Sequence, residues 1–510
     1  MNASRLIAGL ALVASLALSG SAQAAGPPKV RIDSGALVGV EANGVSAFKG
    51  IPFAAPPVGA LRWLAPQRAA HWTGDRAADA YGAPCMQALS KDNGLGQAAP
   101  SEDCLTVNVW SPDLKPAKKL PVMVWIHGGG YTGGSGTALL YDGTELAKQG
   151  VVLVTLNYRL GRFGFFAHPA LSAEAKGKVA DNFGMLDMIA ALQWVKRNAA
   201  AFGGDASNVT IFGESAGGAA VHALMVSPQA RGLFAKAISE SGAGRAMPAI
   251  LDKPGPRGMP SAVADGEAFA KKLGASTVTE LRALPADKIQ AAGALSVFSG
   301  GGPVIDGVTL PMGPVEAFSK GKQAKVPFLI GANNVELPGT LASYKNTAAT
   351  WGGASEAQLA ELAKYYPDPD TFALNVAGEM SMVEPARWLA GVHARSNPTW
   401  LYRFSVVTAA QRPGMKGARH AQERQYVFRT LSASPWKTDA NDEVQAKAMS
   451  AYWVAFAKTG NPNTPGLPAW PAFTAQGDQL LEFTDNGPVA GTSPFAERLN
   501  AIASVRAAAP

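Results

Sequence analysis

Charged residues and cysteines are both scarce in this sequence. Asp, Glu, Lys and Arg make up 16% of the 510 residues, the formal net charge is +7, and no Lys/Arg cluster stands out. Nucleic-acid binding needs a concentrated basic patch, so we do not expect it. Cys85 and Cys104 are the only cysteines, and no neighbouring His or Cys completes a metal-binding set. We therefore expect neither a metal ion nor a cofactor.

No hydrophobic run is long enough to span a bilayer as a mature helix. The most apolar one, Leu6 to Leu18, lies within residues 1–24 between Arg5 and Ala22-Gln-Ala24, which is the pattern of a cleavable secretory signal. We expect a soluble mature chain without a membrane anchor, exported to the periplasm or the medium. In an exported protein the lone cysteine pair most simply forms one disulfide, and two buried thiols are the alternative.

The rest of the chain has the composition of a globular α/β protein. Apolar residues make up 47% of the sequence, and strand-like and helix-like runs alternate. No linker or charge block divides the chain, so we predict one domain over residues 25–510 with inserted loops and helices. The apolar runs Pro121–Ile126 and Val151–Leu156 are typical of strands buried on both faces of a parallel sheet. A helix from about Gly184 to Ala201 should follow, N-capped by Asp181 or Asn182.

The next stretch, Val209–Phe212 followed by Gly213-Glu-Ser-Ala-Gly217, predicts a nucleophile on a sharp turn. The glycines two residues to either side of Ser215 leave room for a turn from strand to helix, so the hydroxyl would project into open space. N–H groups at the start of the helix favour negative charge at that point. A plain Gly/Ser turn is the alternative.

A second glycine-rich stretch, His127-Gly-Gly-Gly130, follows the strand Pro121–Ile126. Consecutive glycines let a backbone approach a ligand closely and present unobstructed N–H groups. We identify Gly129 and Gly130, together with Ala216, as candidate oxyanion donors. A phosphate-binding loop is the alternative, but no Lys-Ser/Thr pair follows.

A serine hydroxyl is nearly inert at neutral pH, so Ser215 needs a base. Among six histidines, His420 fits best, because it follows the nucleophile in the chain and lies in a loop past the late strand Thr399–Val407. His393 is the alternative, although it falls in a helix-like run. Protonation of His420 should reduce activity around an apparent pKa of ~6.5 before environmental shifts. The remaining histidines are disfavoured by position: His71, His127, His168 and His222.

The base in turn needs a carboxylate to orient it. Glu336 follows the end of the apolar strand Val326–Gly331, at the sheet edge where sites of such proteins lie. Asp306 is the alternative, although Asp-Gly more often marks a turn. We expect Glu214, beside the serine, to add negative potential and hydrogen bonds behind the site, and a solvated strand end is its alternative.

Together these motifs resemble the type-B carboxylesterase family, the α/β-hydrolase branch that includes cholinesterases and bacterial para-nitrobenzyl esterases. The resemblance covers nearly all of the mature chain and rests on motifs in the family's order: Phe48-Lys-Gly-Ile-Pro-Phe, Pro56-Pro-Val-Gly-Ala-Leu-Arg-Trp, Ser101-Glu-Asp-Cys-Leu, Trp125-Ile-His-Gly-Gly-Gly, Asn157-Tyr-Arg-Leu-Gly, Phe202-Gly-Gly-Asp, Gly213-Glu-Ser-Ala-Gly-Gly and Gly460-Asn-Pro-Asn.

The resemblance implies an α/β-hydrolase fold, in which a large and mostly parallel sheet is flanked by helices and carries cap insertions. It also implies a serine esterase that hydrolyses small carboxylic esters through an acyl-enzyme. A lipase, a detoxifying esterase for bulky esters, and a non-catalytic binding protein of the same fold are the alternatives. The residues that it assigns agree with those above: Ser215, Glu336 and His420 as the catalytic set, Gly129, Gly130 and Ala216 as oxyanion donors, and Cys85–Cys104 as a disulfide.

Two departures from the family pattern bear on specificity. Cholinesterases carry a tryptophan in the first disulfide loop, but residues 86–103 contain none, so choline esters are not expected as substrates. Around the acid, Asn333-Asn-Val-Glu-Leu-Pro-Gly replaces the usual Asp/Asn-Glu-Gly, and Pro338 is expected to change the nearby pocket wall.

Overall fold

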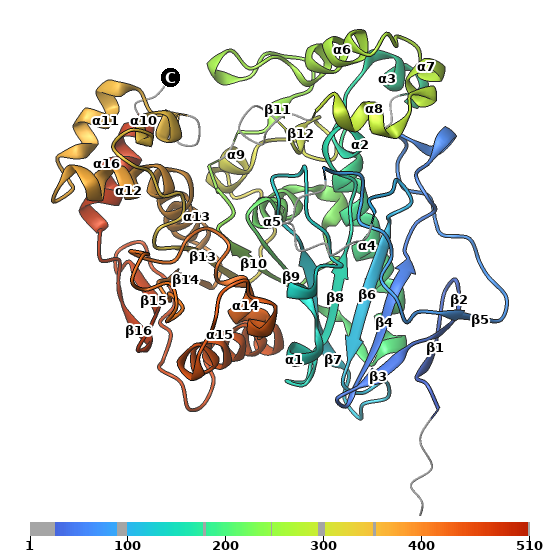
Figure 1. Ribbon diagram of the computed structural model, residues 1–510, viewed down its shortest axis with the longest axis horizontal. Coiled ribbons are helices and arrows are strands. Elements are labelled where there is room, and N and C mark those ends of the chain that lie inside the picture. The colour runs from blue at the N-terminus through green and yellow to red at the C-terminus, as the bar shows by residue number, and fades with distance from the viewer. Residues whose placement is uncertain are drawn as a thin grey trace, which may run out of the picture.

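The computed structural model of the chain describes residues 26–88, 99–176, 180–245, 247–293, 301–349 and 353–507, so the predicted signal segment lies outside the described residues. An eleven-stranded sheet runs through the molecule in the order β16-β15-β14-β13-β10-β9-β7-β8-β6-β4-β3 (Figure 1). Its strands are β3 (Val40–Ala42), β4 (Val45–Pro52), β6 (Thr106–Ser111), β7 (Leu120–Ile126), β8 (Val152–Leu156), β9 (Gly204–Glu214), β10 (Lys236–Glu240), β13 (Phe328–Asn333), β14 (Thr399–Phe404), β15 (Gln479–Thr484) and β16 (Gly487–Thr492).

The sheet is parallel from β8 through β15 and antiparallel at both edges. All five residues of β8 are buried, and in β7 every residue except Leu120 is buried. A strand covered on both faces can be apolar throughout, which explains these continuous runs. The predicted α/β-hydrolase architecture is confirmed. A separate small sheet contains β1 (Lys29–Ile32), β2 (Gly35–Val38) and β5 (Asp75–Ala77), and a two-stranded one contains β11 (Ala249–Ile250) and β12 (Val304–Ile305).

The helix α4 (Phe183–Asn198) returns the chain from β8 towards β9 and ends in the 3₁₀ turn η4 (Ala199–Phe202). Asn182 is the N-cap residue, one of the two predicted, but its side chain makes no capping hydrogen bond. Its Nδ2 instead donates to Val304 O at 2.8 Å, and its Oδ1 accepts from Val304 N at 2.8 Å. Tertiary contacts with β12 therefore replace the local cap.

Two groups of helices lie outside the central sheet (Figure 1). The first group contains α6 (Ala262–Lys272), α7 (Val278–Ala283) and α8 (Ala286–Ala291). The second contains α10 (Tyr344–Thr347), α11 (Glu356–Ala363), α12 (Pro369–Gly378) and the C-terminal α16 (Ala496–Ala507). Within the described ranges, no helix has both the length and the apolar character that a bilayer crossing requires.

Candidate active site

Ser215 occupies a strained turn between β9 and α5 (Ala216–Val226), with φ 57° and ψ −123°. The flanking glycines explain how the chain reaches this conformation. A Cβ on Gly217 would lie 2.0 Å from Ile126 O, and a Cβ on Gly213 would lie 2.6 Å from the same oxygen. Since neither position tolerates a side chain beside β7, the Gly-x-Ser-x-Gly spacing is a packing requirement as well as a motif.

The structure brings the predicted base and acid to this serine. His420 Nε2 lies 2.8 Å from Ser215 Oγ, and His420 Nδ1 lies 2.6 Å from Glu336 Oε2. The second carboxylate oxygen of Glu336 accepts hydrogen bonds from Asn333 N at 2.6 Å and Ser241 Oγ at 2.5 Å. Glu336 is thus buried and fully hydrogen-bonded, which holds the imidazole in one orientation. We refer to Ser215, His420 and Glu336 as the candidate triad.

The glycine loop passes directly beside the serine. A Cβ on Gly128 would lie 3.0 Å from the Ser215 Cβ, and Gly129 and Gly130 have φ values of 103° and 63°. Within the described part of the chain, the N–H groups of Gly129, Gly130 and Ala216 donate no hydrogen bond to a protein acceptor. Backbone donors without partners next to a nucleophile are suited to receive an oxyanion.

Carboxylates set the proton affinity of His420. Burial lowers the pKa of His420, but the charges of Glu214 and Glu336 and the hydrogen bond to Glu336 outweigh burial and raise this pKa to about 9. Glu214 Oε1 lies 3.3 Å from His420 Nε2, and the Glu214 side chain is 1% exposed. Glu214 therefore contacts the base directly, rather than forming a solvated strand end.

The alternative base and acid lie in structural roles elsewhere. His393 is fully buried on α13 (Glu384–His393), where its ring contacts Gln323 and Val326 O, and burial lowers its pKa. Asp306 accepts hydrogen bonds from the backbone N–H groups of Val308 and Leu310, as expected of a turn residue. Neither residue is in hydrogen-bond contact with Ser215 or His420.

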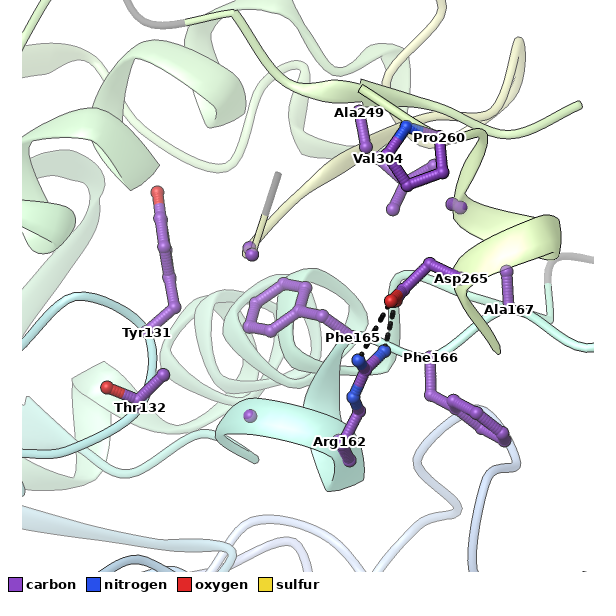
Figure 2. Close-up of a pocket in the computed structure, with 14 residues that line it drawn as sticks. Tyr131, Thr132, Arg162, Phe165, Phe166, Ala167, Ala249, Pro260, Asp265 and Val304 are labelled. Carbon is purple, nitrogen blue, oxygen red and sulfur yellow. Dashed lines mark hydrogen bonds and ion pairs between the residues drawn. The ribbon is translucent and has the colours of Figure 1, made fainter. Parts of the chain in front are cut away.

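A pocket opens beside the glycine loop. Figure 2 shows Tyr131 and Thr132 on one side, the ion pair between Arg162 and Asp265 on the other, and Phe165 between them. Tyr131 directly follows Gly130, so the pocket begins one residue beyond the candidate oxyanion donors. Its walls combine aromatic rings with a charge pair that is already neutralised.

The chain is similar to known proteins over nearly its whole length. The profile of the Carboxylesterase family matches residues 26–365 and 367–502. The chain belongs to the carboxylesterase family. It is 36% identical to the fumonisin B1 esterase of Sphingopyxis macrogoltabida, covering 95% of this chain and 92% of that one. It is 39% identical to the para-nitrobenzyl esterase of Bacillus subtilis, covering 88% and 93%.

Solved structures of carboxylesterases share the fold. A PNB esterase structure superposes with a TM-score of 0.81 at 33% identity, covering 93% of this chain and 99% of that chain. A carboxylesterase of Geobacillus stearothermophilus gives a TM-score of 0.77 at 34% identity with the same coverage. The resemblance inferred from the sequence is confirmed, and the protein is accordingly a carboxylic ester hydrolase.

Sequence reasoning missed Gly378, which packs against the candidate acid. Gly378 ends α12, and a π-helical turn, η9 (Glu379–Val383), follows it before α13. A Cβ on Gly378 would lie 2.9 Å from both Glu336 Cβ and Leu337 N. Because backbone atoms cannot yield as a flexible side chain does, a larger residue here must displace the loop that carries Glu336.

We therefore predict that Gly378→Ala lowers kcat for ester hydrolysis by about tenfold or more, because a displacement of a few tenths of an ångström misorients the acid. KM should change much less, since substrate contacts are not altered. Steady-state kinetics and thermal unfolding should be measured together. Gly391→Ala is the matched control, because Gly391 lies in the next helix, α13, where an added Cβ would come no closer than 3.7 Å to the ring of Phe473. Equal kcat values for wild type and Gly378→Ala would contradict the prediction.

Proposed function

We propose that this protein is an exported serine carboxylesterase in which Ser215 is the nucleophile, His420 the general base and Glu336 the group that orients the base. The observation that carries the proposal is the continuous chain of short contacts, 2.8 Å from Ser215 Oγ to His420 Nε2 and 2.6 Å from His420 Nδ1 to Glu336 Oε2. The sharp turn at Ser215 and the unpartnered N–H groups beside it support the same assignment.

The reaction begins when Ser215 Oγ attacks the ester carbonyl while His420 Nε2 takes the hydroxyl proton. Glu336 stabilises the resulting imidazolium through Nδ1, and the N–H groups of Gly129, Gly130 and Ala216 bind the oxyanion. The imidazolium then protonates the leaving alcohol, which leaves an acyl group on Ser215. Water, deprotonated by His420, attacks this acyl group, and collapse of the second tetrahedral intermediate releases the acid and restores the serine.

The pocket of Figure 2 is proposed to hold one side of the ester. It begins next to the candidate oxyanion donors and is lined by the rings of Tyr131 and Phe165, which favour an apolar group. Its charged pair, Arg162 with Asp265, is neutral as a unit, so it does not require a charged substrate. Two relatives carry the names fumonisin B1 esterase and para-nitrobenzyl esterase, which agrees with an ester substrate.

Ser215→Ala should lower ester hydrolysis by about 10⁴-fold or more, because no other group supplies the attacking oxygen. The measurement is kcat/KM on neutral esters with alcohol groups of graded size, together with labelling by a fluorophosphonate probe. Ser207→Ala is the matched control, because Ser207 is an exposed serine at the other end of β9. Retained hydrolysis or retained labelling in Ser215→Ala would remove Ser215 from its proposed role.

The pH dependence of kcat/KM should reflect the high proton affinity of His420. Only the neutral imidazole accepts the serine proton, so kcat/KM should rise with pH until the His420 pKa, raised to about 9, is passed. Glu214→Gln removes one of the charges that raise this pKa, so the midpoint should move to lower pH. Profiles between about pH 5 and about pH 10 test this on both proteins. A midpoint that does not move in Glu214→Gln would speak against the electrostatic link.

Export is proposed from the signal-like residues 1–24, with the mature domain from residue 25 onwards. In support, Cys85 and Cys104 are joined in a disulfide that closes a loop with a sequence separation of 19, and such bonds persist in oxidising compartments. We predict that the protein recovered from the periplasm or medium of an expressing bacterium begins at Ala25. N-terminal sequencing measures this. Export would be contradicted if the protein were found only in the cytoplasm, with residues 1–24 still attached.

A further inference from the structure

One cation lies close to the candidate triad and has no part in the mechanism above. Arg424 begins α14 (Arg424–Phe428), four residues after His420, and its Nε lies 3.9 Å from Glu214 Oε2. Its Nε also donates to Ala421 O at 2.9 Å, and its Nη1 donates to Tyr141 OH at 2.8 Å. These contacts fix the guanidinium beside Glu214, while 27% of the side chain is exposed.

Glu214 lies between the base and this arginine. One of its oxygens is 3.3 Å from His420 Nε2, the atom bonded to Ser215 Oγ, and the other faces Arg424. Among the described residues, His420 and Arg424 are the basic groups within 4 Å of this carboxylate. A substrate bound at Ser215 therefore lies close to a buried acid whose charge is opposed by Arg424.

Two other buried acids lie in this region, and burial disfavours the charged form of each. Burial raises the pKa of Glu240 well above its usual value, and Trp453 Nε1 donates to its Oε1 at 2.7 Å. Burial, together with the charges of Glu214 and Glu336, raises the pKa of Glu423 to about 8. Burial raises the pKa of Glu214 as well, but the charges of His420 and Arg424 favour its ionised form, so Arg424 is one of two cations that oppose this carboxylate.

We propose that Arg424 is a specificity-determining residue that selects against esters carrying a positive charge. Without it, the carboxylate of Glu214 would attract a cationic group towards Ser215. With it, the positive charge of the guanidinium opposes this attraction. The preferred substrates are then esters without a positive charge. This inference rests on the proposed function, because it assumes that substrates bind at Ser215.

The experiment compares two isosteric acetate esters, one with a trimethylammonioethyl alcohol and one with the uncharged 3,3-dimethylbutyl alcohol. Their shapes match, so the ratio of their kcat/KM values reports charge selection. Wild type should favour the uncharged ester. Arg424→Met should shift the ratio towards the cationic ester by about tenfold at low salt, the effect expected of one unit charge at close range, and by less at high salt.

Two further variants separate charge from structure. Arg424→Lys keeps the positive charge and should retain the wild-type ratio, whereas a general packing defect would affect both esters equally. Arg429→Met is the matched control, because Arg429 lies at the other end of α14 and pairs with Glu145 at 3.2 Å. Should Arg424→Met not fold, Arg424→Gln removes the charge with a polar side chain and should show the same shift.

The outcomes distinguish this inference from the proposed function. Charge selection is overturned if the charge-removing variants hydrolyse the uncharged ester but keep the wild-type ratio, or if wild type hydrolyses both esters equally well. The proposed function fails instead if wild type hydrolyses neither ester and Ser215 is not labelled by a fluorophosphonate, and the inference then fails with it.

Discussion

The parallel register of β9, β10 and β13 is the constraint on which the candidate site depends. Glu214 pairs with Glu240, and Glu240 pairs with Gly331. The next residue of each strand continues the ladder, since Ser215 N donates to Glu240 O and Ser241 N to Gly331 O, both at 2.9 Å. Side chains alternate along a strand, so a slip of one residue would send Ser241 away from the candidate acid. The sheet thus positions both the nucleophile, Ser215, and Ser241, which donates a hydrogen bond to the candidate acid Glu336.

This edge of the sheet gathers buried carboxyl groups, and the chain offsets their desolvation in different ways. Glu336 receives two hydrogen bonds on one oxygen and the imidazole on the other. Burial raises the pKa of Glu240 well above its usual value, and its Oε1 accepts a hydrogen bond from Trp453 Nε1. Glu214 remains beside a cation, Arg424. The negative potential that activates the base therefore comes from a few selected carboxylates, whereas leaving every acid ionised would cost more than packing can offset.

The sequence predicts those parts of the fold and site whose signals are local. Buried strands are apolar runs, and the turn at Ser215 needs glycines at fixed spacing. Both features can be identified without knowing which distant segments they contact. His420 follows from chain order and loop position. Ser241, Gly378 and Arg424 could not be found in this way, because their roles arise from contacts between distant segments. Arg424 and its partner Tyr141 are 283 positions apart, and nothing in the residues around either indicates the other.

The loop of the candidate acid shows how an unusual local sequence can keep the required geometry. Its departure from the family pattern leaves the main chain free to pair with the loop of the base: Val335 N donates to Ala418 O at 3.0 Å and His420 N to Glu336 O at 3.0 Å. The Asn334 side chain adds a bond from Ala418 N at 2.7 Å. Backbone atoms make most of these bonds. The two loops are therefore held together whatever side chains most of their residues carry. The loop sequence can therefore vary while the distance between Glu336 and His420 is preserved.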